Sequence, residues 1–305
     1  MTRMRFDSCH SFLVAAAANE GRSKVLQNQC ERGVAAQRTR RHFSGMRLIL
    51  LACLLSAPLG AQVDVTFLAN EGVMLSAGNK KVLIDGLFRY YGDEYALPAD
   101  STRAKLEGAR SPFDAVDLVL VTHRHGDHFH PAAVAAHLLA NPRATLVTSR
   151  QVIDSVHAPD AIKARLMGRT TSPGLRRRET INGITVEMLG LPHTGGRRHQ
   201  GVEHLGYIVE LGGRRVLHLG DAELTEETLA PLRLDTARVD VALIPSWVVA
   251  QRGGRSLIER WIRPRQVVAF HLSSARDAAE RVRRDVDAAM PGAVTFTRSL
   301  ETRRW

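Results

Sequence analysis

The stretch Leu118–Pro131 reads L-V-L-V-T-H-R-H-G-D-H-F-H-P, and it decides the fold. Its first four residues are apolar, which predicts a buried strand. His123 and His125 follow two residues apart, so on an extended chain both imidazoles point the same way and can bind one ion. The closing proline suits the first turn of a helix, which we expect over Pro131–Ala140. A strand end, a turn and a helix start therefore bring polar side chains into one small volume.

The turn inside this stretch adds two more candidate ligands. We expect Gly126 to let the backbone turn sharply, which aims Asp127 and His128 at a second position beside the first. Imidazole nitrogens with carboxylate oxygens suit zinc, and they also suit manganese or iron. A lone H-x-H is often a solvated loop. Four potential ligands within six residues at a strand end, however, predict a metal site.

This H-x-H-x-D-H motif resembles the signature of the metallo-β-lactamase superfamily. Members of that family complete their site with a distant histidine, an acidic residue and a last histidine, each at the end of a strand. The chain offers a candidate for each at the end of an apolar run, in the same order: His193, Asp221 and His271. The resemblance covers the chain after residue 61 and implies an α/β fold, a four-layer αββα sandwich. The alternation of β-like and α-like segments agrees with helices packed on sheet faces.

The resemblance implies a dinuclear centre built from seven side chains. One ion would be held by three histidines, His123, His125 and His193. The second ion would be held by Asp127, His128 and His271, with Asp221 as the bridge between the two. The expected cofactor is therefore two divalent metal ions, with zinc as first choice and manganese or iron as alternatives.

The resemblance also implies an enzyme, a metal-dependent hydrolase most like the small single-domain hydrolases related to ascorbate-phosphate lactonase. Two dications lower the pKa of a shared water toward about 7, which makes hydroxide at neutral pH. The expected reaction is attack of this metal-bound hydroxide on a small-molecule substrate of the ester, lactone or phosphodiester type. Asp127, besides ligating, is expected to orient the hydroxide and pass its proton to the leaving group.

Three residues are expected to be catalytic: Asp127, Asp221 and His204. Asp221 also bears on the type of reaction, because true β-lactamases of the superfamily lack a bridging carboxylate. His204 precedes the predicted strand Leu205–Leu211 and is a candidate for substrate contact or proton transfer. His218 lies inside another predicted strand and is expected to be a buried core histidine.

Other functions remain as alternatives. The first is a β-lactamase that hydrolyses β-lactam antibiotics. A nuclease of this fold would normally carry an additional substrate-binding domain, and a flavodiiron-type oxidoreductase would need a fused flavin domain. We see no room for either in residues 62–305. A non-catalytic metal-binding protein would have lost some ligands, whereas all seven are present here.

Further residues are expected near the site without being ligands. Asp85 ends the strand-like run K-V-L-I-D and would either orient a metal-bound imidazole or cap a turn. The aromatic segment Phe88–Tyr95 is expected to form a wall that faces substrate, with a local hydrophobic cluster as the alternative. His199 ends a basic loop and is expected to be solvated. Asp160–Met167 is expected to be helical.

The first 61 of the 305 residues look unlike the rest. Residues 46–61 run from a basic start through an apolar core to small residues, which predicts a signal peptide too short for a comfortable membrane span. We expect cleavage near Ala61, and translation to start near Met46, which would make residues 1–45 a dispensable leader. An unusually long leader is the alternative. The expected product is a periplasmic or secreted domain over 62–305, with no stable membrane association after cleavage.

The composition of the chain limits the kinds of partner that we expect it to bind. All three cysteines lie in the first 61 residues, so the predicted mature chain needs no disulfide and has no thiolate ligand. The net charge is +11, but residues 1–61 hold nine Lys/Arg and three Asp/Glu, which leaves +5 on residues 62–305. The cluster Arg176–Arg178 is expected to be a solvated loop, since no stacking aromatics are interleaved with it. We therefore expect no nucleic-acid partner. Oligomeric state does not follow from the sequence.

Overall fold

The computed structural model describes residues 60–305. The predicted leader, residues 1–45, lies outside the described residues, and so does the predicted signal peptide except for its last two residues. Within residues 60–305, no helix is long and apolar enough to cross a membrane.

Within the described residues, the strands form two sheets of seven strands each. In spatial order, the first sheet consists of β14 (Thr302–Arg304), β1 (Asp64–Ala69), β2 (Gly72–Ala77), β3 (Lys80–Ile84), β4 (Leu118–Val121), β5 (Thr145–Ser149) and β6 (Leu166–Arg169). Strands β1 to β3 form an antiparallel meander, whereas β3 to β6 run parallel. The parallel strands therefore bring their carboxyl ends to one edge of the sheet.

The second sheet has a matching arrangement. In spatial order it consists of β13 (Val294–Thr295), β12 (Gln266–Phe270), β11 (Val241–Pro245), β10 (Arg214–His218), β9 (Leu205–Leu211), β8 (Ile184–Gly190) and β7 (Arg176–Ile181). Strands β7 to β10 are antiparallel neighbours, and β10 to β13 run parallel. Strands β8, β10 and β12 therefore all end at the same edge.

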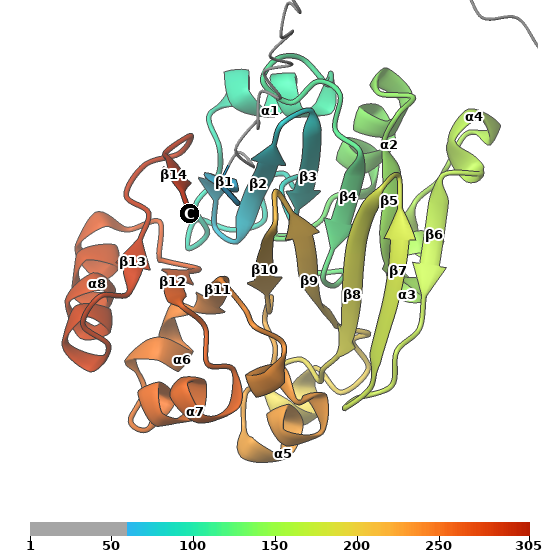
Figure 1. Cartoon of the computed structure of the whole chain (residues 1–305). Helices are drawn as coiled ribbons and strands as arrows, with labels where there is room; N and C mark the ends of the chain where they lie inside the picture. The colour runs from blue at the N-terminus through green and yellow to red at the C-terminus, as the bar shows by residue number, and fades with distance from the viewer. Residues whose placement is uncertain (1–59) are drawn as a thin grey trace, which may run out of the picture. The chain divides into compact units, whose positions relative to one another are not determined.

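The two sheets and the helices on their outer faces form four layers, which can be followed in Figure 1. Three apolar clusters lie between these layers. One cluster fills the space between the sheets and includes Val65, Leu120 and Tyr207. A second packs the first sheet against the helices α1 (Asp100–Glu107), α2 (Pro131–Ala140), α3 (Arg150–Ser155) and α4 (Asp160–Lys163). The third packs the second sheet against α5 (Glu226–Leu229), α6 (Ser246–Ala250), α7 (Gly254–Trp261) and α8 (Arg276–Ala289). The predicted αββα sandwich is confirmed.

A single buried tyrosine joins the two sheets at the edge where β4 ends. The Tyr207 side chain on β9 is fully buried, and its hydroxyl lies 2.7 Å from the carbonyl oxygen of Val121, to which it donates. Val121 is the last residue of β4 and stands two residues before His123. Because a buried hydroxyl without a partner would be costly, this bond fixes where the strand end lies against the second sheet.

Two predictions about local structure were wrong. Asp160–Met167 is not one helix, because α4 ends at Lys163 and Leu166–Arg169 instead pairs with β5 as the edge strand β6. Arg176–Arg178 is not a solvated loop but the start of β7, paired with β8. Carboxylates on the neighbouring strands neutralise these arginines: Glu187 pairs with Arg176, and Glu210 pairs with Arg178. Short runs of this kind carry too little periodicity to separate helix, strand and loop.

Candidate metal centre

The candidate ligands follow the ends of strands that share one edge. His123 lies two residues after β4, and His193 lies three residues after β8. Asp221 lies three residues after β10, and His271 directly follows β12. The carboxyl ends of parallel strands are the usual place for a site in such sheets. The topology therefore brings together side chains that are up to 148 residues apart in the chain.

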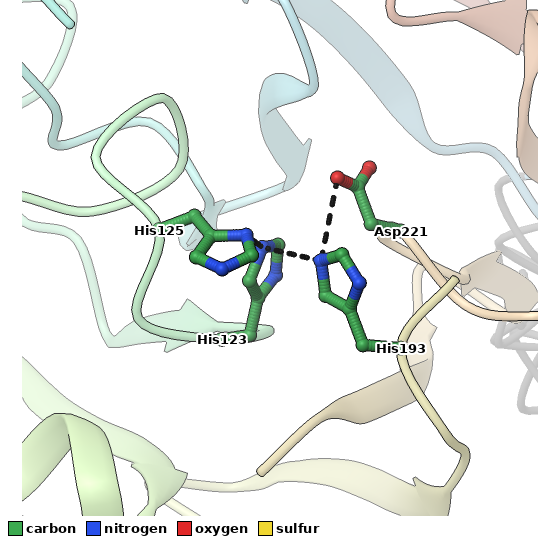
Figure 2. A group of neighbouring side chains, drawn as sticks. All are labelled: His123, His125, His193 and Asp221. Carbon is green, nitrogen blue, oxygen red and sulfur yellow. Dashed lines mark hydrogen bonds and ion pairs between the residues drawn. The ribbon is translucent and has the colours of Figure 1, made fainter. Parts of the chain in front are cut away.

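A first group of donor atoms comes from three histidines and one aspartate, His123, His125, His193 and Asp221. Figure 2 shows their polar atoms turned toward one another, and one donor atom from each lies within 4.8 Å of the others. The Nε2 atom of His123 is 3.0 Å from Nδ1 of His125 and 3.3 Å from Nε2 of His193. The Nε2 atom of His193 is 3.6 Å from Oδ2 of Asp221.

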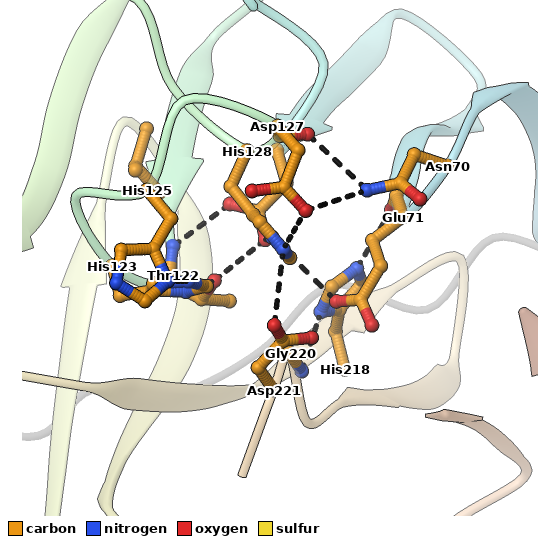
Figure 3. A network of polar contacts seen from close by, with 12 residues as sticks. Asn70, Glu71, Thr122, His123, His125, Asp127, His128, His218, Gly220 and Asp221 are labelled. Atoms are coloured by element: carbon orange, nitrogen blue, oxygen red, sulfur yellow. Dashed lines mark hydrogen bonds and ion pairs between the residues drawn. The ribbon is translucent and has the colours of Figure 1, made fainter. Parts of the chain in front are cut away.

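A second group lies beside the first and shares Asp221 with it. Its members are Asp127, His128, Asp221 and His271. The Oδ2 atom of Asp127 is 3.3 Å from Nε2 of His128 and 3.4 Å from Nε2 of His271. The two oxygens of Asp221 point to different histidines, with Oδ2 3.6 Å from His128 and Oδ1 3.7 Å from His271. Figure 3 shows Asp221 opposite Asp127 and His128.

The chemistry of these groups fits divalent ions. Nε2 of His128 and Oδ1 of Asp221 are buried and have no hydrogen-bond partner. Leaving such an atom unpaired costs about 1–3 kcal/mol, so a protein rarely buries several together without a further role. Imidazole nitrogens and carboxylate oxygens grouped within 4.8 Å can both be satisfied by an ion. The residues that were expected to hold each ion are the ones that the fold brings together.

Electrostatics differ between the two groups. Burial, followed by the neighbouring imidazoles, lowers the pKa of His123 well below its ordinary value. Burial also lowers the pKa of His125, to about 4, so this ring is neutral at pH 7 and free to ligate. Burial alone would lower the pKa of His128 as well, but the carboxylates of Asp221 and Asp127 outweigh it and raise that pKa. The three histidines of the first group are therefore neutral donors, whereas the second group is a coupled set of charges.

Asp85 orients two of the histidines from behind. Its Oδ2 lies 2.9 Å from Nδ1 of His128 and accepts a hydrogen bond of 2.6 Å from the Thr122 hydroxyl. Its Oδ1 accepts a 2.8 Å bond from the Thr122 backbone N–H. The same hydroxyl is 3.0 Å from Nδ1 of His123. Such contacts fix which ring nitrogen faces an ion, so the structure favours the orienting role of Asp85 over the alternative of capping a turn.

Sequence reasoning missed two residues beside the site, Asn70 and Glu71. The Asn70 amide donates to Oδ2 of Asp127 at 3.2 Å and to its carbonyl oxygen at 3.3 Å. Glu71 is fully buried, its Oε2 lies 3.7 Å from Nδ1 of His128, and burial raises its pKa well above the ordinary value. Both lie in N-E-G between two strands, which reads as an ordinary turn. Figure 3 shows both residues on the side of Asp127 away from His125.

His218 is the buried core histidine that was expected. His218 is the last residue of β10, its ring is fully buried, and its Nε2 lies 3.0 Å from the carbonyl oxygen of Glu71. Its Nδ1 accepts from the backbone N–H of Gly220 at 3.2 Å. Both ring nitrogens are thus used within the fold, and the ring faces Glu71 rather than the two donor groups.

The prediction that Gly126 is needed for a sharp backbone turn was wrong. Its φ is not positive, so the turn does not require the conformational freedom of glycine. The requirement is space, because a Cβ atom at Gly126 would lie 2.2 Å from Cδ2 of Tyr91. Tyr91 thus packs directly on the turn that carries Asp127 and His128. A side chain that meets the ligand turn from outside is a feature that local sequence does not reveal.

The aromatic segment divides into residues that face the site and residues that do not. The Tyr95 ring centroid lies 5.8 Å from that of His271, and Tyr91 and Tyr95 lie 5.6 Å apart. Phe88 is buried in contrast, and Tyr90 is exposed beside Asp93. The structure therefore places two of these aromatic rings, Tyr91 and Tyr95, next to candidate ligands or their turn.

Two more histidines pack around the first group. His204 is buried, with its ring centroid 5.3 Å from that of His123 and 5.8 Å from that of His193. His199 is half-buried rather than solvated, because its ring packs 4.6 Å from His193 and 5.0 Å from His125. The expectation for His199 was therefore wrong. The loop that carries it folds back over the ligands instead of extending into solvent.

Comparisons with known proteins agree with this architecture. Residues 80–291 match the model of a family described as a β-lactamase superfamily domain. A UPF0173 metal-dependent hydrolase of Pyrococcus abyssi is 26% identical over 223 residues, which are 70% of this chain and 85% of that protein. One from Heliobacterium modesticaldum is 28% identical over 221 residues, 70% of this chain and 83% of that protein.

Solved structures resemble the fold as well. The metallo hydrolase Igni18 of Ignicoccus hospitalis superposes with a TM-score of 0.54 at 18% identity, covering 80% of this chain and 98% of that one. The metallo-β-lactamase fold protein YhfI of Bacillus subtilis gives 0.54 at 16% identity, covering 80% of this chain and all of that one. At these identities the likeness concerns the fold alone.

Proposed function

The chain belongs to the metallo-β-lactamase superfamily and is a metal-dependent hydrolase, and from this we propose that it uses two divalent ions to hydrolyse a small ester, lactone or phosphodiester-type substrate. The observation that carries the proposal is the pair of donor groups that share Asp221. Each group offers four donors, and Oδ2 of the shared carboxylate lies 3.6 Å from a histidine of each group, His193 and His128. Zinc suits this donor set best, with manganese or iron as alternatives.

When bound, two such ions supply Lewis acidity and a water of lowered pKa. The protein's own part begins with Asp127, whose Oδ2 faces His128 and His271 and is held by the Asn70 amide. This fixed carboxylate is placed to accept the proton of the attacking water and deliver it to the leaving oxygen. Asp221 belongs to both donor groups and so fixes the position of one group relative to the other. Asp127 and Asp221 are thus the proposed catalytic carboxylates.

His204 is the third proposed catalytic residue, through contact with substrate. Its ring is buried beside His123 and His193, and neither ring nitrogen has a hydrogen-bond partner. Burial lowers its pKa to about 3, so at pH 7 the ring is neutral and can both donate and accept. These properties favour substrate contact over proton transfer near neutral pH.

Hydrolysis of a lactone serves as an example of the proposed reaction. The oxygen of one water forms a bond to the acyl carbon, and the bond from that carbon to the ring oxygen breaks. One proton of the water goes to the departing alkoxide and the other is released to solvent as the new carboxylic acid ionises, so the products are a carboxylate and an alcohol on one chain. No covalent intermediate with the protein is needed, because the nucleophile is water.

A panel of substrates tests the proposal. The full chain would be purified, analysed for metal, and assayed with lactones, carboxylic esters, bis(p-nitrophenyl) phosphate and the β-lactam nitrocefin. We expect metal-dependent hydrolysis of a lactone, ester or phosphodiester that a chelator abolishes and added metal restores. Turnover of nitrocefin alone would favour the β-lactamase alternative, which the names of the relatives do not favour. Hydrolysis that survives complete metal removal would refute the proposal.

The cellular location of the protein is a separate proposal, which rests on residues 46–61. Their basic, apolar and small-residue order is typical of a secretory signal, so we propose a periplasmic or secreted protein. N-terminal sequencing of the protein from an expressing bacterium tests this. A terminus near residue 62 in the periplasmic or external fraction supports the proposal, and an uncleaved chain in the cytosol contradicts it.

A further inference from the structure

A cavity of about 550 Å³ opens beside the first donor group. It lies where β5, β6 and β8 end, and His193, His199 and His204 form part of its wall. Its volume falls in the range of sites that enclose small organic molecules. Because His193 belongs both to the cavity wall and to the donor group, a molecule in the cavity would touch the candidate centre.

Most of the apolar wall comes from two segments. Leu191 and Pro192 follow β8, and Val202 and Leu205 lie before and at the start of β9. Pro173 is a further apolar residue of the wall. Such a wall gains free energy by removing carbon atoms of a ligand from water, at about 25 cal/mol for each Å².

Two residues of the wall carry buried polar atoms that have no hydrogen-bond partner. The His204 side chain is 4% exposed and both of its ring nitrogens lack a hydrogen-bond partner. The hydroxyl of Thr171 is also buried without a partner. These atoms have almost no accessible area, so they lie behind the surface of the cavity rather than in it. The surface that a ligand would meet is therefore largely apolar.

Two of the four charged residues of the wall, Arg169 and Glu203, are hydrogen-bonded within the protein, whereas Arg197 and Glu223 have no side-chain partner among the described residues. Arg169 donates three hydrogen bonds to Glu179, and Glu203 accepts from the backbone N–H of Gln151. Arg197 is exposed. Phosphoryl groups are usually bound by free arginine or lysine in addition to metal. Among the described residues that line this cavity, no arginine is both buried and unpaired.

We propose that the cavity binds a largely apolar arm of a carboxylic ester or lactone. This inference rests on the proposed hydrolase function and narrows its substrate class. It makes the cavity wall the determinant of specificity, whereas the seven candidate ligands act on the ester group itself.

Two lactones with the same ring test the inference, γ-butyrolactone without an arm and γ-nonalactone with a pentyl arm. The metal-loaded full chain would be assayed with both by a pH indicator. We expect kcat/KM for the lactone with the arm to be at least about tenfold higher, because several CH₂ groups leave water. Val202→Phe fills the cavity from a loop, and it should lower this preference at least about fivefold while metal content and circular dichroism stay unchanged.

A matched control introduces the same phenylalanine side chain into a different cavity. Ala293→Phe fills a cavity of about 410 Å³ at the start of β12, at the opposite end of that strand from His271. It should leave the preference as in the unaltered protein.

The outcomes separate the inference from the proposed function. Equal kcat/KM for both lactones, or a preference that survives Val202→Phe, overturns the inference and leaves the metal-dependent hydrolase intact. Hydrolysis of bis(p-nitrophenyl) phosphate with no lactone or ester turnover also overturns it. If no substrate of any class is hydrolysed by the metal-loaded chain, the proposed function itself fails.

Discussion

The Nε2 atoms of His123 and His193 lie 3.3 Å apart, although 70 residues separate the two side chains in the sequence. Both rings have a pKa that burial lowers, so two neutral imidazoles face one another rather than repel as cations. Nothing local holds them there, since one follows β4 of the first sheet and the other follows β8 of the second. The whole sandwich is needed to bring them together.

Removal of the shared carboxylate should abolish activity without unfolding the chain. We expect Asp221→Ala to lower the hydrolysis rate roughly a hundredfold or more, and Asp127→Ala to do the same. Circular dichroism should stay unchanged in both. Asp240→Ala is the matched control, because Asp240 is a carboxylate at the opposite end of the second sheet, bonded to Arg214 and Arg215. It should lose stability and keep metal and activity. Full activity in Asp221→Ala would refute the role of Asp221.

Asp85 should matter for metal affinity rather than for folding alone. Asp85→Asn keeps the shape but loses the carboxylate that accepts from His128 and Thr122, so we expect metal affinity to fall about 10–100-fold. A competition titration with a chelating dye measures this. Asp117 is equally buried but binds Lys80 and Arg143 at the start of β4, far along the strand from His123. Asp117→Asn should therefore leave metal affinity unchanged, and an equal loss in both variants would contradict this reading of Asp85.

The two donor groups should lose metal at different pH values. A proton competes with an ion for an imidazole, and a raised pKa means that the proton persists to higher pH. Because its carboxylate neighbours raise the pKa of His128, ions in the second group should leave first as pH falls from 8. His125, with its pKa lowered to about 4, meets this competition only near pH 4. Dialysis over a pH series followed by metal analysis of the wild type and of His271→Ala distinguishes the groups. Simultaneous loss of both ions would contradict the assignment.

Contact between Gly126 and Tyr91 predicts a coupled pair of mutations. Gly126→Ala places a Cβ against the Tyr91 ring, so the ring or the ligand turn must move, and we expect activity to fall about tenfold or less. Tyr91 is 54% exposed and can therefore be truncated at little cost to folding. In a Tyr91→Ala background, Gly126→Ala should have almost no effect on activity. If both backgrounds lose activity equally, the backbone conformation rather than space explains this glycine.

The sequence could predict the fold and the seven candidate ligands because both depend on strongly patterned segments. The run Leu118–Val121 followed by H-x-H-x-D-H is short, buried and chemically unusual, so little else fits it. What could not be predicted depends on contacts between distant segments. Asn70 and Glu71 occupy an unremarkable turn, and their position beside Asp127 and His128 exists only after both sheets have formed.

Contacts between residues far apart in the sequence also explain why two further predictions were wrong. Arg176 and Arg178 were predicted to lie in a loop because their partners Glu187 and Glu210 lie on other strands. His199 read as solvated because the loop before it has no period, although its ring packs on His125 and His193. In both cases the tertiary partner, rather than local propensity, decided the structure.

The number of metal ions per chain tests the central claim most directly. Metal analysis of the purified full chain, with native mass spectrometry, should give about two ions per chain. His193→Ala should retain the ion of the second group and His271→Ala that of the first, so each should give about one. A wild-type chain that binds one ion or none under saturating metal, or a His271→Ala variant that still binds two, would contradict a centre built from two donor groups around Asp221.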